Sequence, residues 1–216
     1  MSASVAPDNT TATSAAAQSA ARAPRSLNWR VVDIVVASVL AVACGLIFVV
    51  WNSVGYAWFS AMDAVTPGLG GLATGIWLIG GVIGALVIRK PGAAIYVEVL
   101  AATVSAVLGS QWGISTLYSG LAQGLGVELI VLAFAYRKFG LTISLLAGAG
   151  AGVGAWVLEF FMGNIAKDAQ FNIIYLVCLI LSGAILAGGV GYYLVQALAR
   201  TGALDRFAVG REARGK

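Results

Sequence analysis

The sequence has 216 residues, of which 60% are apolar and only 10% carry a charged side chain. Soluble domains carry about 25% charged residues, so this composition excludes a soluble globular enzyme, a disordered chain and a nucleic-acid-binding protein. The sequence contains no histidine, which excludes histidine-based catalytic triads, the usual zinc sites and histidine proton relays. Cys44 and Cys178 lie inside apolar runs without metal-ligand spacing. We expect an all-α integral membrane protein with no metal and no cofactor.

Residues 1–29 are predicted to be a disordered tail, because they are rich in Ala, Ser and Thr and lack the apolar stretch of a secretory signal. Most of the apolar runs that follow reach the roughly 17–25 residues of a membrane-spanning helix. A six-helix membrane domain over 30–200 is therefore expected, followed by a basic C-terminal tail over 201–216. The six apolar runs cover residues 31–51, 67–88, 92–108, 115–136, 141–161 and 171–198.

The basic residues predict the orientation of these spans. Twelve of the thirteen precede the first span, follow the sixth, or lie between spans two and three or four and five; Lys167 is the exception. Cytoplasmic loops carry the excess of Lys and Arg, so both termini are expected in the cytoplasm of a multi-pass plasma-membrane protein. The outer connections 52–66, 109–114 and 162–170 carry aromatic residues, which fit either interfacial anchors or a lid over an outward-facing pocket.

No Lys is followed by Ser or Thr, so the chain has no Walker A loop and no ATP hydrolysis of its own is expected.

Two patterns of small residues indicate close helix packing or docking. The glycines of 148–154 lie inside an apolar run and favour close helix packing. Ala37, Ala41 and Gly45 form a small-residue stripe, either for packing within the chain or for docking a partner membrane subunit.

Three carboxylates, Glu98, Glu128 and Glu159, lie within the spans, and no basic residue of a span interior can pair with them. Each would cost about 2.5–3.5 kcal/mol at a lipid-facing helix centre, so we expect them to face inward. Three roles fit them. As protonated carboxylic acids they could hydrogen-bond between helices, or they could line a proton or cation pathway. The third role, which we favour, is a binding site for a cationic or amine-bearing solute. Aromatic faces for such a solute are available from other spans: Trp77, Trp156, Tyr118 and Tyr175. Asp33 is expected to form a surface pair with Arg30.

Several segments in series resemble the YkoE-type S components of energy-coupling factor (ECF) transporters, the thiamine/hydroxymethylpyrimidine group. They are Gly-Ile-Trp at 75–77, Arg-Lys-Pro-Gly-Ala-Ala at 89–94 followed by Glu98, Gln-Gly-Leu-Gly-Val-Glu at 123–128, Ser-Gly-Ala-Ile-Leu-Ala-Gly at 182–188 and Thr-Gly at 201–202. The resemblance covers about 30–210 and implies an S-component-like bundle that captures a vitamin from outside. It also implies a transmembrane coupling subunit and two ABC-type ATPases as partners, with Ala37, Ala41 and Gly45 as docking face.

The resulting hypothesis is a pocket for thiamine or its hydroxymethylpyrimidine precursor. An aminopyrimidine offers an amino donor beside a ring nitrogen, which one carboxyl group can meet with two hydrogen bonds. We expect Glu98 or Glu128 to do so, with Gln123 assisting if the glycines around it bend the fourth helix. The thiazolium cation of thiamine is assigned to Glu159 with Trp77, Trp156 or Tyr175. The alternatives are an S component for another vitamin, a stand-alone proton- or cation-coupled permease, and a purely structural scaffold.

Overall fold

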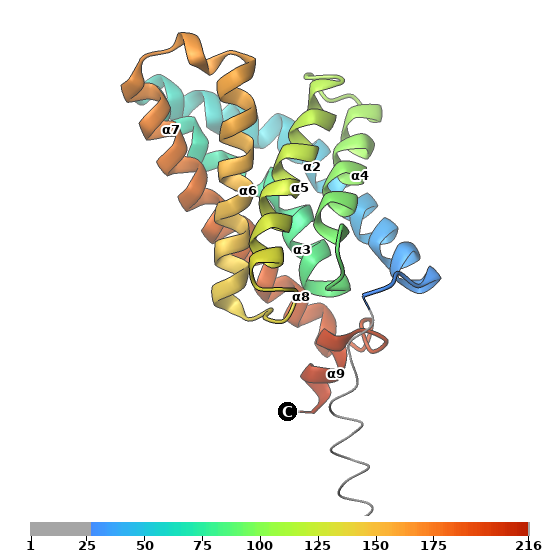
Figure 1. The fold of residues 1–216 in the computed structure, drawn as a ribbon. Coiled ribbons are helices and arrows are strands. Elements are labelled where there is room, and N and C mark those ends of the chain that lie inside the picture. Colours follow the sequence, from blue (N-terminus) through green and yellow to red (C-terminus); the bar gives the residue numbers. More distant parts are fainter. Residues whose placement is uncertain (1–26, 216) are drawn as a thin grey trace, which may run out of the picture.

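The computed structural model describes residues 27–215, and every regular element in that range is helical (Figure 1). The expected tail over 1–29 thus lies almost wholly outside the described residues. In the bundle α4, α5 and α6 run roughly alongside one another, and α2 crosses them obliquely (Figure 1). In chain order the elements are α2 (Val31–Val65), the 3-10 helix η1 (Leu69–Leu78), α3 (Ile79–Ile88), α4 (Ala93–Val107), α5 (Ser115–Ala133), α6 (Leu141–Met162), the 3-10 turn η2 (Asn164–Ala166), α7 (Ala169–Ser182), the π-helical η3 (Gly183–Val190), α8 (Gly191–Arg200) and α9 (Ala208–Arg214).

All six predicted apolar runs are helical. Five continuous helical segments of the described chain are long and apolar enough to cross a membrane, and α4 is a shorter apolar helix of 15 residues. The second run changes from 3-10 to α geometry at Ile79, and the sixth is continuous from α7 through η3 to α8. The prediction of a connection over 52–66 was wrong, because α2 continues as helix to Val65. That extension supplies part of the cavity described below.

The centre of the bundle is α3, all ten residues of which are buried. Its glycines let the neighbouring helix approach closely: a Cβ on Gly84 would lie 2.8 Å from both Val97 Cβ and the Ala93 carbonyl oxygen of α4. Without a hydrophobic driving force between helices in lipid, such close van der Waals packing is a main source of association. The position of α4 against the central helix is therefore fixed at short range.

The stripe of Ala37, Ala41 and Gly45 packs within the chain. Ala37 and Ala41 have no exposed surface, and a Cβ on Gly45 would lie 2.8 Å from the Ala101 carbonyl oxygen of α4. The stripe thus holds α2 against α4. This arrangement disagrees with its assignment as a docking face, because no surface of Ala37 or Ala41 is left for a partner.

Basic connections gather at one end of the bundle, here called the basic end, where Arg89, Arg137 and α9 meet. Asp33 is fully buried there between Arg30 and Lys90, so it is not the surface pair expected from the sequence. The expected C-terminal tail also packs on this end. Arg89 donates to both carboxylate oxygens of Glu212 on α9, at 2.6 and 2.8 Å, while Phe207 and Val209 are buried.

Candidate functional site

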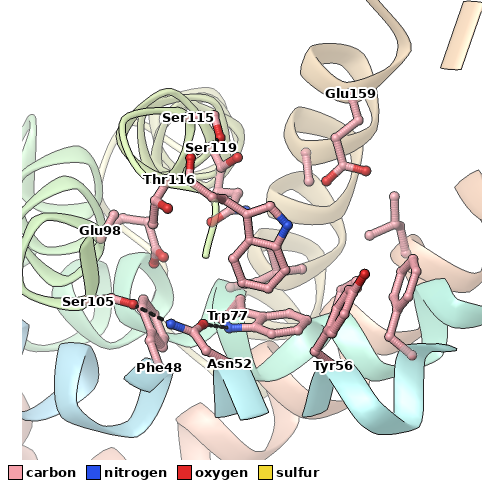
Figure 2. Close-up of a pocket in the computed structure, with 18 of the residues that line it drawn as sticks. Phe48, Asn52, Tyr56, Trp77, Glu98, Ser105, Ser115, Thr116, Ser119 and Glu159 are labelled. Atoms are coloured by element: carbon pink, nitrogen blue, oxygen red, sulfur yellow. Dashed lines mark hydrogen bonds between the residues drawn. The ribbon is translucent and has the colours of Figure 1, made fainter. Parts of the chain in front are cut away.

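A cavity of about 460 Å³ lies between the helices (Figure 2). Its lining includes Tyr56 on the last turns of α2 and Met162 at the end of α6, so it lies toward the end of the bundle opposite the basic end. Its volume falls within the roughly 300–1,000 Å³ of small-molecule sites. Side chains from α2, η1, α4, α5, α6 and α7 line it, together with Trp112 from the connection between α4 and α5. The lining residues are Phe48, Asn52, Tyr56, Phe59, Thr74, Trp77, Leu78, Glu98, Ala102, Ser105, Trp112, Ser115, Thr116, Ser119, Gln123, Ala155, Glu159, Met162, Tyr175 and Leu179.

The cavity has one polar and one aromatic side. The polar side comes from α5, whose Ser115, Thr116, Ser119 and Gln123 follow the spacing of one helix face. The aromatic side comes from α2 and η1 and consists of Phe48, Tyr56, Phe59 and Trp77. Such a cavity suits a flat solute with apolar ring faces and polar ring edges.

Glu98 of α4 forms part of the wall and is only 1% exposed. Its Oε2 accepts a hydrogen bond from the backbone N–H of Gly81, near the junction of η1 and α3. A Cβ on the adjacent Gly80 would lie 2.9 Å from this oxygen, so the glycine pair leaves room for the carboxylate. Its other oxygen, Oε1, has no hydrogen-bond partner within the described part of the chain. A buried polar atom of this kind is costly unless a ligand or a water molecule hydrogen-bonds to it.

Glu159 lies near the end of α6 that is farthest from the basic end, and Tyr175 of α7 holds it in place. The tyrosine hydroxyl donates to Glu159 Oε2 across 2.5 Å. The Tyr175 ring is itself fixed by aromatic neighbours, stacked on Phe171 with 5.5 Å between centroids and edge-on to Phe59 at 6.3 Å. The cavity therefore carries one carboxylate on α4 and another on α6, and none of its described lining residues is basic.

Trp77 is held on the aromatic side by Asn52. The indole N–H of Trp77 donates to Asn52 Oδ1 at 2.9 Å, and Asn52 Nδ2 donates to Ser105 Oγ at the same distance (Figure 2). Trp112 packs edge-on against Trp77, with 5.6 Å between ring centroids, and against Tyr56 at 5.4 Å. These contacts form an aromatic cluster at the side of the cavity.

The structure brings together five of the eight residues predicted to contact ligand: Glu98, Glu159, Trp77, Gln123 and Tyr175 all line the cavity. Gln123 reaches it from an uninterrupted α-helix, so no bend of the fourth span is needed. The binding roles of these five residues remain predictions.

Glu128 is not at the cavity. It lies five residues beyond Gln123 on α5, which places it about 7 Å closer to the basic end. Its carboxylate accepts hydrogen bonds from the backbone N–H groups of Gly92 and Ala94, at 2.6 and 3.1 Å, and from the Tyr136 hydroxyl. Glu128 thus caps the start of α4, which corrects its assignment as a ligand contact.

Tyr118 and Trp156 are also absent from the cavity lining. Tyr118 precedes Ser119 on α5 and is turned about 100° away from it around the helix, so its side chain is exposed. Trp156 stacks on Phe160, and its indole N–H donates to the Asn172 carbonyl oxygen at 3.1 Å. Neither arrangement agrees with a role in contacting ligand.

Sequence reasoning did not select Asn52, Ser105 or the hydroxyl residues of α5 as site residues. The α5 residues carry a usable signal, because four polar residues at helical spacing in an otherwise apolar span mark an inward face. Asn52 carries no such signal, since its role depends on Trp77 and Ser105 of other helices.

Comparison with known proteins agrees with this architecture. A family model described as "ABC-type cobalt transport system, permease component" matches residues 32–154. The Bacillus subtilis (strain 168) protein named "Putative HMP/thiamine permease protein YkoE" is 34% identical over 194 residues, which are 88% of this chain and 94% of that protein. The chain belongs to the YkoE-type S components of ECF transporters.

A solved structure supports the assignment of the chain to this family. The crystal structure of an S-component of an ECF transporter matches with a TM-score of 0.80 and 33% identity, covering 87% of this chain and 94% of that one. The chain is accordingly a multi-pass plasma-membrane protein and a non-enzymatic permease subunit. Membership implies partnership with the membrane and ATPase subunits of an ECF transporter.

Proposed function

We propose that this S component captures thiamine or hydroxymethylpyrimidine in the cavity, from the outer side of the membrane. The observation that carries the proposal is the carboxylate of Glu98, half-satisfied by Gly81 and forming the wall of an aromatic-lined cavity. The permease named for HMP and thiamine, 34% identical to this chain, supports the same substrate class.

Glu98 is assigned to the aminopyrimidine. Its Oε1 is a free acceptor that suits an amino donor, and Gln123 lines the same cavity with an amide that can both donate and accept. The ring faces of the pyrimidine then pack against Phe48 and Trp77 of the aromatic side. Glu128 is no longer a candidate for this role.

Glu159 is assigned to the thiazolium cation of thiamine. A fixed positive charge is stabilised by a nearby carboxylate and by the faces of aromatic rings. The Tyr175 hydroxyl keeps Glu159 in position with its 2.5 Å hydrogen bond, and Tyr175 and Trp77 both line the cavity. Hydroxymethylpyrimidine is uncharged and does not need this second carboxylate.

The partners proposed for transport are a transmembrane coupling subunit and two ABC-type ATPases. The chain contains no Walker A loop of its own, in keeping with ATP hydrolysis by other subunits. Because Ala37 and Ala41 are buried against α4, docking would use a surface other than that stripe.

The test is isothermal titration calorimetry of the purified full chain in detergent with thiamine and with hydroxymethylpyrimidine. We expect sub-micromolar binding of at least one. Glu98→Gln presents an amide donor in place of an acceptor and should weaken both ligands by about tenfold or more. Glu159→Gln should weaken thiamine more than hydroxymethylpyrimidine.

Glu128→Gln is the matched control, because it makes the same chemical change on a carboxylate outside the cavity. Its affinities should stay within about twofold of the unmodified chain. Folded protein that binds neither compound would contradict the proposal, and binding of a different vitamin would reassign the substrate within the same family.

A further inference from the structure

A hydrogen-bond chain runs along one side of the cavity and joins three helices. Trp77 of η1 donates to Asn52 of α2, and Asn52 donates to Ser105 of α4, each across 2.9 Å (Figure 2). All three residues line the cavity. These two hydrogen bonds therefore connect the aromatic side to α4, the helix that carries Glu98.

Trp77 fixes which atom donates in each of these two hydrogen bonds. An indole N–H can only donate, so it must face the amide oxygen of Asn52, which leaves the amide nitrogen to face Ser105. Ser105 Oγ consequently acts as an acceptor from Asn52, and its own proton still needs an acceptor.

Ser105 lacks that acceptor within the described part of the chain. A helical serine or threonine often donates to the carbonyl four residues earlier, and Thr103 on the same helix does so, to Val99 at 2.7 Å. Ser105 makes no such bond, although it is only 1% exposed and lines the cavity.

We infer that Ser105 donates its hydroxyl proton to the bound ligand, and that it selects a ligand with an acceptor at that position. This inference rests on the proposed function and deepens it. Glu98 and Ser105 are seven residues apart on one face of α4, or about 10 Å along the helix axis. Glu98 therefore offers an acceptor deep in the cavity, and Ser105 offers a donor two turns farther out.

The spacing discriminates between the two proposed ligands. A single substituted pyrimidine is too short to reach both positions. Thiamine has two rings and a hydroxyl-bearing tail, so its amino group can meet Glu98 while an oxygen at its far end accepts from Ser105. Ser105 thus favours the two-ring vitamin over its pyrimidine precursor.

Asn52 is a positioning residue in this arrangement and acts through Ser105. In Asn52→Asp both side-chain oxygens are acceptors, so the new carboxylate accepts from Trp77 and from Ser105 together. Ser105 then donates its proton to the carboxylate at position 52 and no longer donates it to the ligand. The shape of the side chain is nearly unchanged.

The experiment is calorimetric titration of the full chain in detergent with thiamine and with hydroxymethylpyrimidine. Ser105→Ala should weaken thiamine binding about five- to tenfold, the value of one hydrogen bond, and leave hydroxymethylpyrimidine within about twofold. Thr103→Ala, which removes a hydroxyl of α4 outside the cavity lining, should change neither affinity.

A double-mutant cycle tests the role of Asn52. In the Asn52→Asp background, Ser105→Ala should no longer weaken thiamine binding, and the added charge cancels because both arms carry it. The inference is overturned if Ser105→Ala weakens both ligands equally, if it weakens neither, or if its effect persists in that background. Failure of the unmodified folded chain to bind either ligand would instead overturn the proposed function.

Discussion

Tyr136 donates its hydroxyl proton to Glu128 across 2.5 Å, in the turn that follows α5. The same carboxylate accepts the backbone N–H groups of Gly92 and Ala94, so it ties the end of α5 to the start of α4. Tyr136 and the preceding Ala135 have φ angles of 55° and 51°, which are uncommon for residues with a Cβ. The carboxylate thus helps hold a turn that the backbone alone disfavours.

Removing this carboxylate should destabilise the chain without changing ligand affinity. Glu128→Leu leaves two backbone donors and one hydroxyl without their acceptor, and we expect a loss of about 2–4 kcal/mol in the free energy of unfolding. Thermal unfolding in detergent measures the loss, with Glu128→Gln expected to retain part of the stability. A stable Glu128→Leu protein that no longer binds thiamine would contradict the placement of Glu128 outside the cavity.

The same pair predicts a dependence of stability on pH. Burial, and next the hydrogen bond to Glu128, raise the pKa of Tyr136 above its ordinary value. Because the pKa is higher in the folded state, the stabilisation is complete below the unfolded pKa of about 10 and is lost as the pH rises above it. The difference in melting temperature between the unmodified chain and Tyr136→Phe should shrink as the pH rises above about 10. A difference independent of pH would count against this linkage.

Gly45 distinguishes internal packing from partner docking. A Cβ there would lie 2.7 Å from Val104 Cβ, so Gly45→Leu should force α2 away from α4 and cost about 1–3 kcal/mol. Thermal unfolding of the isolated subunit tests this. Ala43→Leu, at an exposed position of the same helix, is the control and should unfold like the unmodified chain. If Gly45→Leu left stability intact and only blocked assembly with partner subunits, the docking role would return.

The buried pair of Asp33 and Lys90 should be sensitive to the loss of either partner. Asp33 is fully buried and Lys90 nearly so. Asp33→Ala leaves the Lys90 ammonium without its carboxylate, and we expect a cost of about 3–5 kcal/mol. The double variant Asp33→Ala/Lys90→Met removes both charges and should recover much of this loss in thermal unfolding. Equal melting temperatures for the single and double variants would contradict the interpretation.

The apolar runs predicted where the helices lie, because run length and hydropathy directly reflect the membrane environment. They did not predict where α2 ends. Asn52, Tyr56 and Asp63 interrupt the apolar pattern and suggested a connection. In the structure Asn52 and Tyr56 line the cavity, and Asp63 accepts the backbone N–H of Gly68 at the helix end. Polar residues that face a cavity or close a turn are indistinguishable, along the sequence alone, from residues of a loop.

The carboxylates show the same limit. Glu98 and Glu128 both lie among small residues within apolar runs, so local sequence gave them equal standing as ligand contacts. The start of α4 lies against Glu128, whereas the Gly80–Gly81 notch of α3 receives Glu98. The backbone N–H groups that hydrogen-bond to each carboxylate come from other helices. A local sequence pattern does not show these contacts between helices.

The length of α2 has a consequence for the setting in which ligand is captured. Its 35 residues extend about 52 Å, well beyond the roughly 30 Å of hydrocarbon in a bilayer. The helix must therefore tilt or project into the headgroup layer. Its last turns carry Tyr56 and Phe59 of the cavity wall, so the depth of these rings relative to the lipid surface follows the tilt of the helix. Acyl-chain length should therefore change how far this part of the cavity wall lies from the lipid surface.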